Sequence, residues 1–208
     1  GAGMAQTPRR GGALRVAVPR EGAFLARVAR AAVYDQLTEV ALDGVLRGEL
    51  ATGWRSDETA RRWEFRLRQE VSFHDGRLMT GADVIASIEA HLLTGELQIA
   101  GLRSLDLSST GDVVFDLADG SPHLPYRLAD TGLVIAPDGD VCAALADLNG
   151  TGLYRVDRAQ DERHFRARRT EGNYRSEIAG WLDALDLIVI PDPSVRAEAL
   201  RVYKYLHL

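Results

Sequence analysis

"FHDGRLMTGADVIASIE", residues 73–89, decides how the first half of the chain folds, because it joins a tight corner to a helical pattern. Gly76 can adopt the positive φ that a tight turn requires. Thr80, followed three residues later by Asp83, has the spacing of a capping box. We therefore expect a glycine corner that leads into a helix over residues 81–92.

His74 and Asp75 are neighbours in this corner, which raises the question of a catalytic or metal-binding pair. Adjacent residues in a turn point in different directions, and such a pair also needs a third partner and a cleft. A structural corner is the simpler interpretation, with Asp75 bonded to the turn backbone and His74 holding the corner. A hydrolase that uses His74 and Asp75 stays open as an alternative hypothesis, behind the two functions described below.

Composition indicates a globular protein that is long enough to bury a substantial core. The chain has 208 residues, of which 46% are hydrophobic and 26% charged. A formal net charge of -5 argues against nucleic acid as a partner. Cys142 is the only cysteine, and we expect it to be a buried structural thiol. The histidines have no metal-binding spacing, so we expect neither a metal ion nor a cofactor.

Alternating apolar residues and turn signals predict most of the remaining elements. Helices are expected at residues 25–37 and 141–148. Single strands are expected at residues 13–19, 132–137 and 185–193. Hairpins are expected at residues 38–50, 53–73, 102–118 and 153–170. This order predicts an α/β (mixed α+β) fold, in which one mixed β-sheet lobe carries hairpins and flanking helices.

Five stretches, in register along the chain, resemble the extracytoplasmic solute-binding proteins of ABC importers that take up oligopeptides, dipeptides and nickel. The most specific is "WEFRLRQEVSFHDGRLMTGADVIASIEAHL" (63–92), with its aromatic strand, Phe-His-Asp-Gly corner and threonine cap. The others are "GGALRVAVP" (11–19), "VYDQLTEVALDGVLRGELATGW" (33–54), "GTGLYRV" (150–156) and "GNYRSEIAGWLDALDLIVIPDPSVRAEAL" (172–200).

The resemblance implies the fold of the first lobe of a two-lobed periplasmic binding protein, which traps its ligand between the lobes. It implies a non-enzymatic function, in which a peptide or other small solute is captured and delivered to ABC permease subunits. A periplasmic or extracytoplasmic location follows from the same resemblance. His74, Asp75, Gly76, Thr80 and Asp83 would then be a structural signature of the family.

The resemblance also implies a division of the chain. Residues 1–10 are interpreted as an expression scar and flexible N-terminus, and residues 11–200 as the N-terminal lobe. Residues 201–208 would be a C-terminal tail at the point where a second lobe normally begins. Because family members are longer, the chain is either a truncated piece or a natural short member, and a second lobe would be a missing partner.

Ligand contacts are expected at Arg20, Glu21 and Phe24, at the edge of the cleft. These residues follow the first strand at its carboxyl end, where open α/β sheets place ligands. Arg20 would pair with a solute carboxylate and Glu21 with an amino group, which suits a peptide. Here "PREGAF" (19–24) stands where relatives carry a longer loop that ends in an Asp-Pro pair.

A second function, of a different class, is a short interaction module derived from the same lobe. Such a module would contact a permease or another partner without enclosing a ligand. A large exposed apolar patch would indicate a missing lobe or an obligate partner, whereas a polar surface would indicate an independent short protein.

Overall fold

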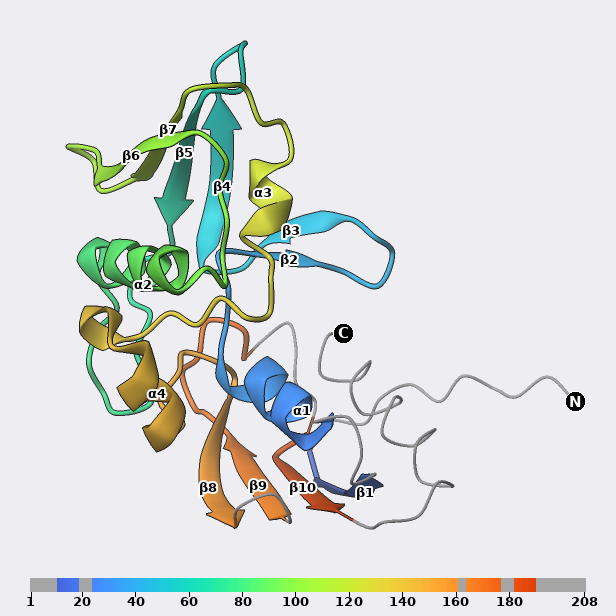
Figure 1. Cartoon of the computed structure of the whole chain (residues 1–208). Helices are drawn as coiled ribbons and strands as arrows, with labels where there is room; N and C mark the ends of the chain where they lie inside the picture. The colour runs from blue at the N-terminus through green and yellow to red at the C-terminus, as the bar shows by residue number, and fades with distance from the viewer. Residues whose placement is uncertain (1–10, 19–23, 161–163, 177–181, 190–208) are drawn as a thin grey trace, which may run out of the picture. The chain divides into compact units, whose positions relative to one another are not determined.

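The structure is a computed structural model that describes most of the chain, namely residues 11–18, 24–160, 164–176 and 182–189. The chain divides into two compact units (Figure 1). One unit combines the described parts of Gly1–Ala32 and Leu153–Leu208, and the other is Val33–Gly152. Helices and sheets occur together, so the mixed α/β class predicted from the sequence is confirmed.

The first unit is built on a four-stranded mixed sheet with the strand order β1-β10-β9-β8. β1 runs parallel to β10, and the other neighbours are antiparallel. The elements are β1 (Ala13–Val18), α1 (Phe24–Val33), β8 (Tyr154–Gln160), β9 (His164–Arg169) and β10 (Ala184–Val189). Alternate residues of β9 and β10 are buried, as a period of two requires: Phe165, Ala167, Leu185 and Leu187.

The second unit contains an antiparallel sheet with the strand order β4-β5-β7-β6. Its strands are β4 (Ala51–Ser56), β5 (Arg62–Leu67), β6 (Leu102–Leu107) and β7 (Val113–Leu117). Phe65 and Phe115 are fully buried and meet edge to face, with ring centroids 5.5 Å apart. One face of this sheet therefore forms the core, and the other carries the charged residues of β5.

The remaining elements of the second unit are the hairpin β2 (Thr38–Val40) and β3 (Leu46–Gly48), α2 (Gly81–Thr94), α3 (Leu124–Arg127), the short 3-10 helix η1 (Pro137–Gly139) and α4 (Val141–Asp147). Figure 1 shows α2 at one end of this sheet, and α3 and the β2–β3 hairpin beside β4. The four predicted hairpins and the helix after the glycine corner are all present.

The predicted helix over residues 25–37 is wrong at its end, because α1 stops at Val33. Backbone groups of the next residues bond across the chain instead of within a helix. The Leu37 carbonyl accepts from the Glu49 and Ala51 N–H groups at 3.0 and 2.9 Å, and the Gln36 N–H donates to the Glu49 carboxylate at 2.8 Å. Long-range hydrogen bonds thus override local helical periodicity.

The strand predicted over residues 132–137 is also wrong, although this segment is buried as expected. Its backbone pairs with side chains of α2 rather than with another strand. Asp83, Ser87 and His91 repeat every four residues along one stripe of α2. They bond to the backbone of residues 138, 136 and 134, respectively.

Cys142 is exposed near the start of α4, so the prediction of a buried thiol is wrong. The apolar, helix-forming residues around Cys142 in "VCAALADL" favour burial of the thiol. In α4 only Ala144 is buried, and the helix lies at the surface of its unit.

Candidate functional site

Both ring nitrogens of His74 bond to backbone groups of one loop. Nε2 donates to the Gly152 carbonyl at 2.8 Å, because a carbonyl can only accept. Nδ1 accepts from the Gly150 N–H at 3.5 Å, and the His74 N–H donates to the Gly150 carbonyl at 2.9 Å. These bonds tie the corner to residues 150–152.

Asp75 is directed toward Arg77 and Asn149 instead of the His74 ring. Its Oδ2 accepts from Arg77 Nε at 3.0 Å and from Asn149 Nδ2 at 2.9 Å, and its Oδ1 accepts from the Arg77 N–H at 3.0 Å. Desolvation raises the pKa of Asp75, but the bonds from Arg77 and Asn149 outweigh it and hold the pKa below its ordinary value. The carboxylate is therefore ionised at neutral pH, and its contribution to stability is lost as pH falls through the lowered pKa.

The backbone of the corner has the features that its sequence predicts. Gly76 has a φ of 94°. The Asp83 N–H donates to Thr80 Oγ1 at 3.1 Å, and the Thr80 N–H donates to Asp83 Oδ2 at 2.8 Å, so the capping box is present. The hydrogen bonds of His74 and Asp75 thus hold the corner together and fasten it to residues 149–152.

The residues predicted to contact ligand follow β1 in the sequence. Arg20 and Glu21 fall outside the described residues, and for Phe24 the structure describes only the backbone, at the start of α1. β1 ends at Val18, and its parallel neighbour β10 ends at Val189, so both carboxyl ends reach the same edge of the sheet. In open α/β sheets, ligands bind beyond such an edge.

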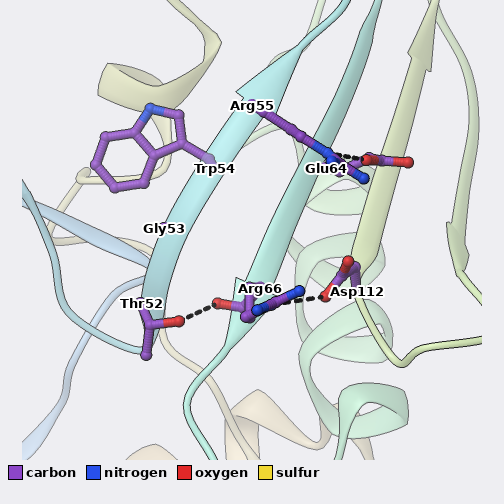
Figure 2. A pocket seen from close by; sticks show the side chains of 7 residues that line it. All are labelled: Thr52, Gly53, Trp54, Arg55, Glu64, Arg66 and Asp112. Atoms are coloured by element: carbon purple, nitrogen blue, oxygen red, sulfur yellow. Dashed lines mark hydrogen bonds and ion pairs between the residues drawn. The ribbon is translucent and has the colours of Figure 1, made fainter.

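A shallow hollow of about 300 Å³ lies on the charged face of the β4-β5-β7-β6 sheet (Figure 2). Its lining residues are Thr52, Gly53, Trp54, Arg55, Glu64, Arg66 and Asp112. Sequence reasoning missed this hollow. The alternation in "WEFRLR" placed Glu64 and Arg66 on one face of a strand, but nothing local showed that Gly53 and Arg55 lie beside them.

Ion pairs organise the side chains around the hollow. Arg55 Nε lies 2.6 Å from Glu64 Oε2, and Arg66 Nε lies 3.9 Å from Asp112 Oδ1. The hydrogen bond from Arg55 is the main reason why the pKa of Glu64 lies below its ordinary value, and the same bond raises the pKa of Arg55. Glu64 is therefore a carboxylate at neutral pH.

The described residues contain neither a candidate metal site nor a helix that could span a membrane. No group of three or more His, Cys, Asp or Glu side chains is arranged to hold a metal ion in that part of the chain. Among the helices described, none is long and apolar enough to cross a membrane.

Comparison with known proteins identifies the family. The family described as bacterial extracellular solute-binding proteins, family 5 Middle, matches residues 45–204. A curated relative is the probable D,D-dipeptide-binding periplasmic protein DdpA of Escherichia coli K12. It is 24% identical over 168 residues, which are 77% of this chain and 30% of that protein.

Solved structures share the fold over most of this chain, but the match covers less than half of their own length. AgaA of Agrobacterium tumefaciens R10, in complex with agropinic acid, has a TM-score of 0.75 and 23% identity, over 91% of this chain and 42% of AgaA. NikZ of Campylobacter jejuni, in complex with Ni(L-His), has a TM-score of 0.70 and 21% identity, over 91% of this chain and 41% of NikZ. AppA of Bacillus subtilis, in complex with a nonapeptide, has a TM-score of 0.71 and 21% identity, over 94% of this chain and 43% of AppA.

The chain thus spans less than half the length of these relatives. The family match covers most of the chain and includes the glycine corner, the helix that it opens and the loop that it binds. The chain belongs to the family 5 bacterial extracellular solute-binding proteins.

Proposed function

We propose that this chain is the first lobe of a solute-binding protein that captures a peptide or similar small solute for an ABC importer. The match to the family over residues 45–204 is the observation that carries this proposal. The fold agrees with it, since binding proteins that share the fold have TM-scores of 0.70 to 0.75. These relatives are binding proteins rather than enzymes, which favours capture over chemical transformation.

The proposed solute class is peptides and amino-acid-like compounds. One relative is described as a probable D,D-dipeptide-binding protein, and a neighbour in fold holds a nonapeptide. Other neighbours hold Ni(L-His) and agropinic acid, so the same fold accepts several polar ligands. A peptide has a carboxylate and an amino group, which are the two groups that an arginine and a glutamate would recognise.

Arg20, Glu21 and Phe24 are the proposed ligand contacts. In the sequence they follow β1, whose carboxyl end lies beside that of β10. Arg20 would bind the solute carboxylate, Glu21 the amino group, and Phe24 an apolar side chain. The hydrogen bonds of His74 and Asp75 support a different role for that pair, because their polar groups are already used within the corner.

The proposal also covers the second lobe, the permease partners and the cellular location. Residues 11–200 would form the lobe, a second lobe would complete the cleft, and ABC permease subunits would receive the solute. The location would be periplasmic or extracytoplasmic, which is supported by the periplasmic description of the curated relative. One lobe supplies only part of the contacts, so we expect the chain alone to bind peptide weakly.

A titration of the ¹⁵N-labelled chain with L-alanyl-L-alanine, followed by NMR, tests the proposed contacts. We expect Arg20→Gln to weaken binding about tenfold, because one charge-assisted hydrogen bond is lost. Arg27→Gln removes the same charge from an exposed position of α1 and should leave binding unchanged. Equal effects of the two substitutions would contradict the assignment of Arg20, and tight binding by the chain alone would contradict the need for a second lobe.

The interaction module is a second candidate, and exposed apolar residues on the β2–β3 hairpin favour it. Val40, Leu42 and Val45 are each about half exposed, at 47%, 58% and 51%. These side chains expose apolar surface that a partner would cover. Self-association seen by light scattering, and abolished by Leu42→Ser with Val45→Ser, would support this second function.

A further inference from the structure

We propose that Asn149 is a site of spontaneous deamidation, and that opening of the glycine corner controls the reaction. Asn149 and Asn173 are the asparagines of the chain, and Asn149 is the one that glycine follows. Asparagine is a thermally labile residue, and a following glycine leaves the attacking backbone nitrogen unhindered. The inference goes beyond the proposed function, because the residues involved lie in the Val33–Gly152 unit and no solute takes part.

The reaction uses groups of the chain itself and water. The Gly150 nitrogen attacks Cγ of the Asn149 side chain, so that a C–N bond forms and the Cγ–Nδ2 bond breaks. The proton of the Gly150 N–H leaves with the side-chain nitrogen as ammonia. Water then opens the succinimide ring at either carbonyl and leaves aspartate or isoaspartate at position 149. No oxidant or reductant is consumed.

The folded corner holds the Asn149 amide through both of its polar atoms. Its Oδ1 accepts from the Asp75 N–H at 3.1 Å, and its Nδ2 donates to Asp75 Oδ2 at 2.9 Å. Asp75 is itself fixed, since its carboxylate also accepts from Nε and the backbone N–H of Arg77, each at 3.0 Å. This network restrains the amide and opposes its rotation toward the Gly150 nitrogen.

The attacking nitrogen is restrained as well. The Gly150 N–H donates to His74 Nδ1 at 3.5 Å, and the Gly150 carbonyl accepts from the His74 N–H at 2.9 Å. Gly150 is buried, and a Cβ added to it would lie 2.1 Å from the Val33 carbonyl oxygen. This close packing limits the backbone movement that ring closure needs. The same contact explains why glycine stands at position 150, next to a labile asparagine.

Opening of the corner is therefore the controlling step. A protected group reacts through a transiently opened state, at a rate set by the population of that state. Deamidation would then make the opening permanent. The new carboxylate at position 149 would face the carboxylate of Asp75, which is ionised at neutral pH, and the donor to Asp75 Oδ2 would be lost.

The test compares deamidation at neutral pH in the parent chain, in two variants and in a synthetic peptide of residues 145–154. Mass spectrometry of proteolytic fragments measures the fraction of Asn149 converted. We expect the parent chain to react about tenfold more slowly than the peptide, or slower still, because the corner protects Asn149. Asp75→Ala should raise the rate in the chain about tenfold, since a hydrogen bond to a charged group is lost.

Asp147→Ala is the matched control, because it removes an exposed carboxylate at the end of α4, close to Asn149 in the sequence. It should leave the rate unchanged. Asn149→Asp reproduces the product, and amide exchange of the His74 N–H, which donates to the Gly150 carbonyl, should become about tenfold faster in it.

Three results would overturn the proposal: a parent chain that reacts as fast as the peptide, equal rates in Asp75→Ala and Asp147→Ala, or unchanged exchange of His74 in Asn149→Asp. The comparison of the parent chain with the peptide needs no variant, so it decides the matter even if Asp75→Ala does not fold. None of these outcomes depends on binding of a solute at Arg20.

Discussion

Phe65→Ala is expected to lower the free energy of unfolding of the Val33–Gly152 unit by about 4 kcal/mol, because large-to-small substitutions of buried aromatic residues leave a cavity. Phe65 is fully buried at the centre of an aromatic cluster. Its ring centroid lies 6.2 Å from that of Trp54, 6.3 Å from that of Trp63 and 5.5 Å from that of Phe115. The substitution therefore removes three ring contacts together with the buried area.

Urea denaturation followed by circular dichroism measures this loss. Phe65→Leu is the control, and we expect it to cost about 1.5 kcal/mol, since it keeps most of the volume. A similar slope of free energy against urea for each protein would show that the comparison concerns stability alone. If Phe65→Ala cost no more than Phe65→Leu, the ring cluster would not be the core of this sheet.

His91→Phe is expected to lower the free energy of unfolding by about 3 kcal/mol, because it leaves buried backbone groups without partners. His91 is 3% exposed. Its Nε2 lies 3.0 Å from the Val134 N–H nitrogen and 3.1 Å from the Val134 carbonyl, and its Nδ1 lies 2.8 Å from Glu96 Oε2. Phenylalanine fills a similar volume, so the loss reports hydrogen bonding rather than packing.

The control for His91→Phe lies on the same helix. Leu93 is 90% exposed on α2, and Leu93→Ala should change stability by about 0.5 kcal/mol or less. Amide hydrogen exchange adds a local measurement, because the Val134 N–H should lose its protection in His91→Phe and keep it in Leu93→Ala. Protection of Val134 in both variants would contradict the role of α2 as the partner of this segment.

The glycine corner and the hairpins could be predicted from the sequence because their causes are local. Gly76 provides the positive φ, and Thr80 and Asp83 cap the helix within three residues of each other. Strand alternation around Phe65 likewise lies within one segment. Features of this kind need no information about distant parts of the chain.

The errors arose where distant residues determine the structure. The segment 132–137 has the composition of a strand, but its backbone bonds to side chains of α2. These partners are distant in the sequence: His91 lies 43 residues before Val134, and Ser87 lies 49 residues before Ala136. The end of α1 depends on bonds from residues 36 and 37 to residues 49–51. Local periodicity does not contain either contact.

The candidate sites likewise divide into one that local sequence order predicts and one that depends on distant residues. The position of Arg20, Glu21 and Phe24 after β1 was predicted from chain order, and their part in ligand binding stays a prediction. The hollow beside Gly53 could not be predicted, because Asp112 and Arg66 are 46 residues apart in sequence and meet only through the pairing of β5 with β7.

Capture of a peptide without cleavage is the central claim, and one measurement tests it directly. The chain is dialysed against a mixture of small peptides, and both compartments are analysed by mass spectrometry. We expect a subset of peptides to be enriched on the protein side and every peptide to remain intact. Cleavage products that form with the parent chain and disappear with a folded His74→Ala variant would contradict the claim and show an enzyme that uses His74.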